Sequence, residues 1–116
     1  MNKVVNDFVN TLTKQPEDIL FEQVMALIDD HYDFTPTAFS NGSQQNGVGE
    51  NSGSCKVFSF ALMQQLNEEQ TLSLFGQYYR DVKNTPEKQD HQNIRQFMQH
   101  GFVKLTFEGQ ALSVKG

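Results

Sequence analysis

A polar, glycine-rich run in the middle of the chain most limits what this sequence can form. Residues 40–54 contain four of the eight glycines and almost no apolar side chain. Glycine clusters favour turns, and without apolar side chains a helix or a strand has nothing to bury. We therefore predict a Gly/Ser/Asn-rich loop over residues 40–54. Loops of this length within compact domains are commonly either functional or disordered.

Helical periodicity dominates the chain on both sides of this loop. Apolar residues recur at spacings of three and four in five segments, which lie near residues 4–12, 16–31, 54–66, 68–82 and 90–100. Pro16 suits a first helical position, and Asn67 with Gln70 forms a capping box. Asp90 suits the cap of the last helix, and Gly101 suits the residue after it. The sequence thus predicts about five helices.

Beyond the last predicted helix, apolar residues alternate with polar ones, as they do in strands. Residues 103–107 alternate in this way, Glu108-Gly109 supplies a turn, and residues 112–114 alternate again. This pattern predicts a C-terminal β-hairpin. A lone hairpin is marginally stable in water, and the β-branched and aromatic residues 34–39 are the candidate for a third short strand. The expected fold is α+β, a mostly helical single domain over residues 1–116.

Charge and cysteine content exclude several classes of function. The formal net charge is −5, and the basic residues are scattered, whereas nucleic-acid binding needs a basic surface. No apolar stretch approaches the roughly 18 residues of a membrane-spanning helix. A single cysteine forms no intramolecular disulfide, which fits a reducing compartment. We therefore expect a cytoplasmic protein that binds neither nucleic acid nor membrane.

Cys55 is the side chain with the greatest intrinsic reactivity, and two interpretations of it compete. It follows the glycine-rich run at the predicted start of a helix, where the helix dipole stabilises a thiolate. A thiol nucleophile there would use His91 or His31 as its base, oriented by Asp90 or Asp33. Cys55 also lies in phase with the apolar face of its helix, which favours a buried structural cysteine.

The run before Cys55 could cradle an anion at a helix start, but it matches no cofactor motif. Lys56 falls inside the predicted helix, which excludes a Walker A loop, and the third glycine of a dinucleotide fingerprint is missing. The cluster over residues 29–33, with three aspartates and His31, lacks the spacing of a known metal motif. We therefore predict neither a cofactor nor a metal site.

His91 and Arg95 lie four residues apart on the last predicted helix. They share a face, so together they could bind a carboxylate or a phosphate, and a solvent-facing helix is the competing interpretation. Polar residues of the loop and of the following helix complete the set of candidate ligand-binding residues. That set is Asn41, Glu50, Asn51, Ser54, Lys56, His91 and Arg95.

Four segments lie in order and at consistent spacing: HYDFTPTAFSNG (residues 31–42), GENSGSCKVFSFA (49–61), FGQYYRDV (75–82) and DHQNIRQFMQHG (90–101). Together they resemble the HopJ family of type III effector-like proteins. The resemblance implies a single small domain of similar size and brings no catalytic residues with it. Because the polar runs 51–56 and 90–95 both lie within these segments, we expect the two runs to meet in space.

The chain departs from the family pattern in two places, of which the first bears on location and the second on the C-terminal hairpin. The family takes its name from plant-pathogen proteins delivered into host cells, and an exported effector usually begins with a Ser-rich, unstructured leader. Residues 4–12 instead predict an amphipathic helix. Residues 102–104 also differ from the Trp- and Gly-containing stretch expected there. We therefore expect a bacterial cytoplasmic protein, with type III export implied by the family name alone.

Three functions are compatible with the sequence. The favoured one is a small binding module that uses the 40–54 loop to recognise an unidentified protein or small-molecule partner, and it predicts an inert Cys55. The second is a thiol-dependent hydrolase or transferase, with Cys55 as nucleophile within hydrogen-bond reach of a histidine such as His91. The third is an oligomeric adaptor subunit with a large exposed apolar patch on the hairpin.

Overall fold

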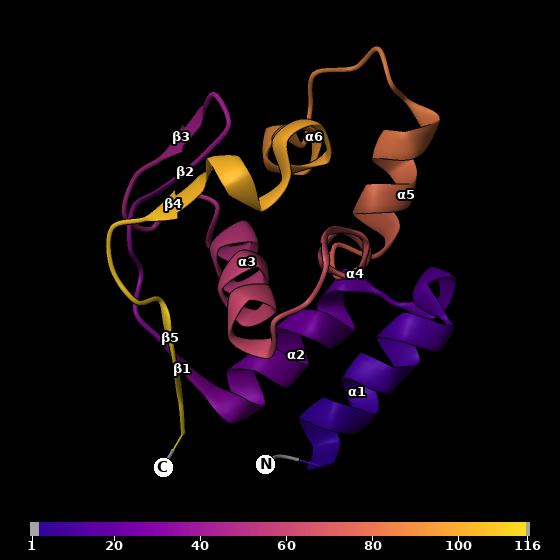
Figure 1. Cartoon of the computed structure of the whole chain (residues 1–116), viewed down its shortest axis with the longest axis vertical. Helices are drawn as coiled ribbons and strands as arrows, with labels where there is room; N and C mark the ends of the chain where they lie inside the picture. Colours follow the sequence, from indigo (N-terminus) through magenta and orange to yellow (C-terminus); the bar gives the residue numbers. More distant parts are fainter. Residues whose placement is uncertain (1–2, 116) are drawn as a thin grey trace.

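A buried helix lies at the centre of the molecule. In the computed structural model, which describes residues 3–115, this helix is α3 (Ser52–Gln64), with other helices and the strands arranged around it (Figure 1). Between Cys55 and Ala61 every residue except Lys56 is buried. A helix that is buried on nearly all sides must be covered by several other elements, so α3 is the support on which the rest of the fold packs.

The α+β class predicted from the sequence is confirmed. The described part of the chain contains six α-helices, two short 3₁₀ helices and five short strands. Besides α3, the helices are α1 (Lys3–Lys14), α2 (Phe21–His31), α4 (Glu68–Ser73), α5 (Gln77–Asn84), α6 (Gln92–His100), η1 (Pro16–Asp18) and η2 (Gly101–Lys104). The strands are β1 (Tyr32–Phe34), β2 (Phe39–Asn41), β3 (Gln44–Asn46), β4 (Leu105–Phe107) and β5 (Leu112–Val114).

The strands form two small antiparallel sheets, and their pairing corrects the predicted C-terminal hairpin. Strands β3, β2 and β4 make one sheet, and β1 pairs with β5 in the other, so β4 and β5 do not pair with each other. The backbone N–H of Thr35 donates to Ala111 and that of Glu108 donates to Ala38, in the register that both strand pairs share. Residues 32–41 therefore run along residues 105–114 as one interrupted antiparallel ribbon.

Segment 34–39, the candidate third strand, lies in this ribbon but is not one continuous strand. Pro36 has no N–H to donate, and residues 35–38 separate β1 from β2. The rings of Phe39 and Phe107 stack across the pair at 5.0 Å, which helps β4 to pair with β2 and not with its neighbour in sequence. The strands β4 and β5 thus pair with strands distant in sequence, and they do not form a local hairpin across the turn at Glu108-Gly109.

The predicted 40–54 loop is largely ordered secondary structure. Strands β2 and β3 form a tight hairpin around Gly42, whose φ of +59° suits glycine. A turn follows, in which the Gly47 N–H donates to the Glu50 carboxylate at 2.6 Å, and α3 begins at Ser52. The run is therefore short of apolar residues because it makes turns and a polar strand, and not because it lacks structure.

One predicted helix divides in two, which gives six α-helices where about five were predicted. Residues 68–82 form α4 and α5, separated at Gly76, which has φ +60° and ψ −127°. A Cβ atom at Gly76 would lie 2.6 Å from the Phe21 backbone nitrogen and 2.9 Å from the Ile19 oxygen. The close approach of the η1–α2 connection thus requires glycine at the break. That connection also shortens the predicted 16–31 helix, because α2 begins only at Phe21.

Two of the predicted helix ends are confirmed in atomic detail. The Gln70 N–H donates to the Asn67 side chain at 2.7 Å, and the Asn67 N–H donates to the Gln70 side chain at 2.9 Å, which is the capping box. Gly101 follows α6 with a φ of +63°. Among the described residues, no helix is both long and apolar enough to cross a bilayer.

We predict that Gly76→Ala destabilises the protein much more than Gly49→Ala does. Both glycines have positive φ, but Gly49 has open space around it, whereas Gly76 faces backbone atoms. Backbone strain alone is worth about 1–2 kcal/mol, and the clash at Gly76 should raise the loss to about 3 kcal/mol or more. Urea denaturation of the two variants measures the difference. Equal losses would show that the close approach is not limiting.

Candidate functional site

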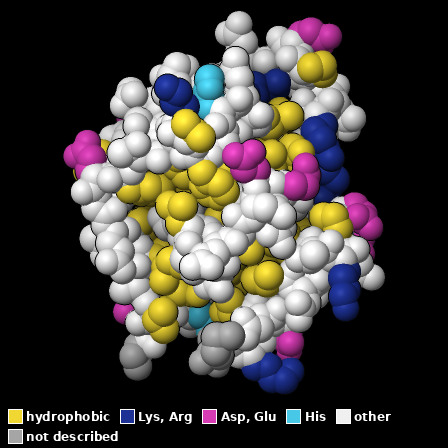
Figure 2. Space-filling model, viewed as in Figure 1, with side chains coloured by type: hydrophobic (Ala, Val, Ile, Leu, Met, Phe, Trp, Pro, Cys, Tyr) yellow, Lys and Arg dark blue, Asp and Glu magenta, His cyan; other side chains and the backbone are white. Residues whose placement is uncertain are grey.

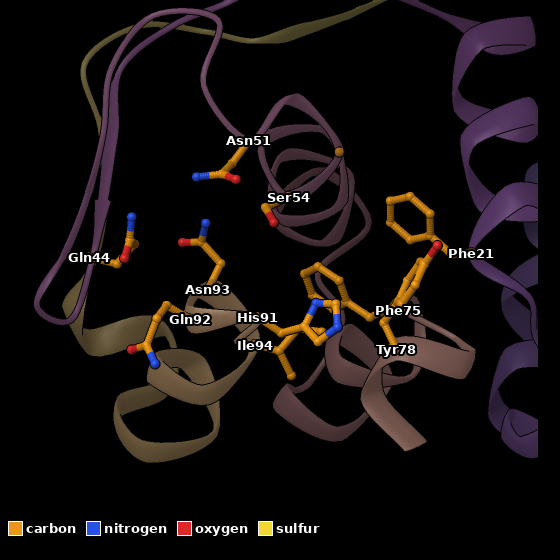
Figure 3. Close-up of a pocket in the computed structure, with 11 residues that line it drawn as sticks. Phe21, Gln44, Asn51, Ser54, Phe75, Tyr78, His91, Gln92, Asn93 and Ile94 are labelled. Carbon is orange, nitrogen blue, oxygen red and sulfur yellow. The ribbon is translucent and has the colours of Figure 1, made fainter. Parts of the chain in front are cut away.

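A pocket of about 450 Å³ opens between the N-terminal ends of α3 and α6. Figure 3 shows aromatic side chains along one side of it and amide and hydroxyl side chains along the other. Residues from five elements or their connections line the pocket. They are Phe21, Gln44, Asn51, Gly53, Ser54, Phe75, Tyr78, His91, Gln92, Asn93 and Ile94.

The aromatic wall is a chain of rings in mutual contact. The Phe21 ring stacks on Phe75 at 6.3 Å and meets Tyr78 edge-on at 5.3 Å, and Tyr78 lies 5.3 Å from the His91 imidazole. Gly53 makes room for this wall, since a Cβ atom there would lie 2.7 Å from the Phe21 ring. The wall is therefore rigid, because each ring is fixed by its neighbours.

The polar wall rests on a network of four asparagines. Asn46 is its centre, where the side-chain oxygen accepts from Asn51 at 2.7 Å and from Asn93 at 2.9 Å. The Asn93 side-chain oxygen in turn accepts from Asn41 at 3.1 Å and from Asn46 at 3.2 Å. Asn41, Asn46 and Asn93 are buried, whereas Asn51 lies at the exposed end. The network joins β2, β3, the start of α3 and α6.

Backbone carbonyls fix which way these amides point. The Asn46 nitrogen donates to the Phe39 carbonyl at 3.2 Å, and the Asn41 nitrogen donates to the Asn93 carbonyl at 2.7 Å. A carbonyl only accepts, so neither amide can be reversed without placing two oxygens together. Asn51 must then donate its nitrogen to Asn46 and leave its own oxygen free. This arrangement of the amides leaves the side-chain oxygen of Asn41 buried with no hydrogen-bond partner, which is unfavourable.

Both helices that meet at the pocket begin in an unusual way. Asn51 and His91 are their N-cap residues, with φ of +51° and +53°, and neither helix start has a side-chain cap. The first helical hydrogen bonds of α3 and α6 are donated by Cys55 and Ile94. The N–H groups of residues 52–54 and 92–93 precede these bonds, so they are the donors that a helix start leaves without intrahelical acceptors.

The prediction that Asp90 caps the last helix is wrong. The N-cap is His91, and the Asp90 carboxylate instead accepts from the Arg95 guanidinium at 2.7 Å. Arg95 also donates to the Thr85 carbonyl at 2.9 Å, so it closes the connection between α5 and α6. The hydrogen bond from Arg95 lowers the pKa of Asp90. Arg95 outcompetes the helix start because it offers a charged donor.

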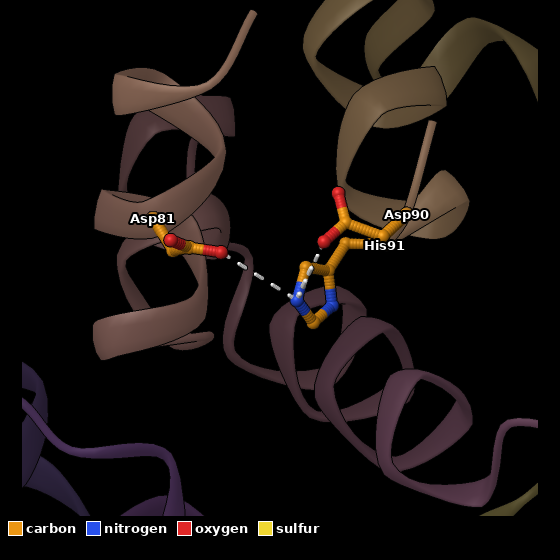
Figure 4. A group of neighbouring side chains, drawn as sticks. All are labelled: Asp81, Asp90 and His91. Carbon is orange, nitrogen blue, oxygen red and sulfur yellow. Dashed lines mark ion pairs between the residues drawn. The ribbon is translucent and has the colours of Figure 1, made fainter. Parts of the chain in front are cut away.

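His91 lies beside two carboxylates, those of Asp81 and Asp90 (Figure 4). Its Nε2 lies 3.9 Å from an oxygen of Asp81 and 3.9 Å from an oxygen of Asp90. These three side chains could hold a divalent cation, and no other such group occurs within residues 3–115. Ion pairing with a protonated imidazole accounts for the same arrangement without a metal.

The structure brings together some of the sequence candidates and separates others. Asn51, Ser54 and His91 line the pocket, as expected for polar runs that meet in space, and Asn41 lies in the asparagine network. Glu50 closes a turn, and Lys56 pairs with Asp29 at 2.8 Å. Arg95 lines a separate groove between α5 and α6.

Cys55 is in the core, which removes the physical basis of an activated thiolate. Cys55 is 1% exposed, and its sulfur lies 3.9 Å from the Thr37 carbonyl oxygen. Burial raises the pKa of the Cys55 thiol. Desolvation disfavours the charged thiolate, and hydrogen bonds at the sulfur involving Thr37 and Ser59 offset it only in part. Neither His91 nor His31 makes a described contact with the sulfur.

Sequence reasoning missed most of the pocket wall. Phe75 and Tyr78 lie in the apolar pattern of the predicted 68–82 helix; Tyr78 is on α5, whereas Phe75 lies in the turn between α4 and α5, and both also line the pocket. Phe21 and Gln44 gave no signal, because their role depends on packing between distant segments. The five-residue spacing of Asn41, Asn46 and Asn51 is a pattern that could have indicated a polar network.

These features define a small α+β domain with a preformed polar and aromatic pocket between two helix starts. The chain belongs to the HopJ family, since the family model described as "HopJ type III effector protein" matches residues 5–112, nearly the whole chain. The crystal structure of VPA0580, a protein of unknown function, is similar, with a TM-score of 0.94 and 50% sequence identity over 99% of this chain and 95% of that chain. A search of curated proteins gives no match.

We predict that Asn41→Asp destabilises the protein by about 3 kcal/mol at neutral pH, because it places a buried carboxylate against the Asn93 carbonyl. Burial raises the pKa of the new carboxyl above its unfolded value, so the loss should shrink as the pH falls towards about 4. Asn10→Asp, on the exposed side of α1, is the control. Urea denaturation across this pH range measures both, and a pH-independent loss would contradict the assigned orientation.

We predict that iodoacetamide labels Cys55 in the native protein at least about a hundredfold more slowly than a free thiol at pH 8. Both the low exposure and the raised pKa act in this direction. Labelling should become fast in denaturant. Fast native labelling that persists at pH 5–6 would instead restore the nucleophile hypothesis.

Proposed function

We propose that the protein is a small binding module and that its site is the pocket between the N-terminal ends of α3 and α6. The observation that carries this proposal is the convergence of two helix starts on one cavity with an aromatic wall and an amide wall. Ligand sites are typically concave, with apolar walls and a few fixed polar groups, and measure roughly 300–1,000 Å³. The pocket, at about 450 Å³, has this size and composition.

The position of the pocket in the family pattern supports the same proposal. Three of the four segments that resemble the HopJ family supply all of the lining residues except Phe21 and Gln44. These segments are distant in sequence and meet at this place. The supporting network is buried and fixes its members, so the polar wall exists before a ligand arrives.

The groove between α5 and α6 is a weaker candidate. Its volume is about 550 Å³, but of its two charged residues Arg95 is already engaged by Asp90 and Thr85, and the Lys83 ammonium lies 4.5 Å from the centre of the Tyr79 ring. A ligand there would have to compete with these bonds. The groove therefore offers fewer free polar groups than the pocket does.

The two alternative functions differ in their support. The thiol enzyme has less support, because Cys55 is buried and burial raises the pKa of its thiol. The adaptor subunit predicts an apolar patch, and Figure 2 shows apolar side chains across the middle of one face, with many charged side chains nearer its edges. Exposed large apolar residues are spread over several elements, including Leu62 on α3, Met98 on α6 and Val103 on η2. The adaptor function stays a prediction, as does a location in the bacterial cytoplasm.

We predict that small polar aromatic fragments shift the backbone NMR signals of Gly53, Ser54, Gln92 and Asn93 above those of other residues. Tyr78→Ala should weaken the binding of such fragments about three- to tenfold, because it removes one of the rings that contact them. Val103→Ala, at a residue that is 85% exposed on η2, is the matched control and should change nothing. The variant spectra also report whether each protein is folded. Shifts that are scattered, or equal in all three proteins, would contradict the proposal.

A further inference from the structure

We infer that the pocket binds an uncharged, planar ligand with a hydrogen-bond donor and an acceptor on one edge, as in an aromatic carboxamide. This inference rests on the proposed binding function and names the chemistry of its ligand. It follows from the charge of the lining, from the free polar atoms and from the shape of the aromatic wall.

The lining disfavours a cationic ligand. None of its residues is Asp, Glu, Lys or Arg, so it offers no carboxylate to a cation. The starts of α3 and α6 carry the positive ends of two helix dipoles, which repel a cation. A cation would lose its hydration in the pocket without compensation.

The two helix starts attract an anion, but side chains at the pocket oppose it. The free oxygen of Asn51 lies on the Ser54 side of the amide, at the pocket (Figure 3), and it would face the anion. The hydrogen bond from the Asn51 nitrogen to the Asn46 oxygen fixes the amide in this orientation. Carboxylate oxygens of Asp81 and Asp90 lie 3.9 Å from the His91 Nε2, and the whole chain has a net charge of −5. An uncharged ligand avoids both conflicts.

The free polar atoms specify one donor and one acceptor on the ligand. The Asn51 oxygen and the Ser54 hydroxyl have no hydrogen-bond partner among the described residues. A ligand N–H can donate to the Asn51 oxygen. A ligand carbonyl can accept from Ser54 or from the N–H groups at the helix starts. A carboxamide carries both groups on one edge.

The opposite wall specifies a flat ligand. Phe21, Tyr78 and His91 present ring surfaces and edges, and a planar ring packs on these better than a branched chain does. The ligand thus has a flat apolar body towards the rings and an amide-like edge towards Asn51 and Ser54.

Three probes of one shape and different charge test the inference: benzamide, benzoate and benzamidine. Each is titrated into the ¹⁵N-labelled full chain, and backbone NMR shifts at the lining residues give the affinity. Benzamide should bind at least about tenfold more tightly than the two charged probes. Ser54→Ala should weaken the affinity for benzamide about three- to tenfold. Ser113 is exposed on β5 and outside the lining, so Ser113→Ala should leave that affinity unchanged.

Each other outcome overturns the inference in a distinct way. Tighter binding of benzoate or benzamidine at the same residues would refute the uncharged ligand and leave the proposed binding function standing. Benzamide shifts outside the lining, or shifts unaffected by Ser54→Ala, would refute the assigned polar edge. If no probe binds, the carboxamide class is wrong, and the fragment experiment above decides the binding function separately.

Discussion

The packing of three other rings around the buried ring of Phe58 is the interaction on which the rest of the structure depends. It lies on α3 and meets the rings of Phe39 on β2, Phe75 after α4 and Phe97 on α6, at 6.2, 5.4 and 5.1 Å. One side chain thereby joins the sheet and two further parts of the helical layer to the central helix. Because Phe97 holds α6 against α3, the starts of these two helices lie side by side. The pocket is a consequence of this packing, and Phe75 belongs both to the core and to the pocket wall.

The asparagine network is the polar counterpart of this aromatic core. Buried amides are costly unless they are hydrogen-bonded, and a network that is nearly satisfied selects one arrangement of the segments that it joins. The side chains of Asn46 and Asn93 each donate a hydrogen bond to the other, which fixes β3 against α6. The unsatisfied oxygen of Asn41 is the cost of fixing every other amide. The direction of these bonds leaves the Asn51 oxygen as a hydrogen-bond acceptor at the exposed end of the network.

Local patterns could predict the helices, and long-range pairing could not be predicted. Periodicity placed most helices, and the capping box at Asn67 was read correctly because its signal lies within four residues. The cap at Asp90 failed because Arg95, one turn further on, competes for the same carboxylate. The helix break at Gly76 depends on Ile19 and Phe21, which no local pattern includes. The same holds for the pocket, whose walls come from segments that periodicity treats separately.

The ribbon between residues 32–41 and 105–114 has a consequence for the order of folding. It closes a long loop of chain, and loop closure of this kind costs entropy before its contacts are formed. Every pocket residue except Phe21 lies between the two halves of the ribbon. During synthesis the second half leaves the ribosome after all of these residues. The pocket is therefore completed late, and a nascent chain that still lacks residues 105–114 carries the side chains of the pocket without the closure that assembles them.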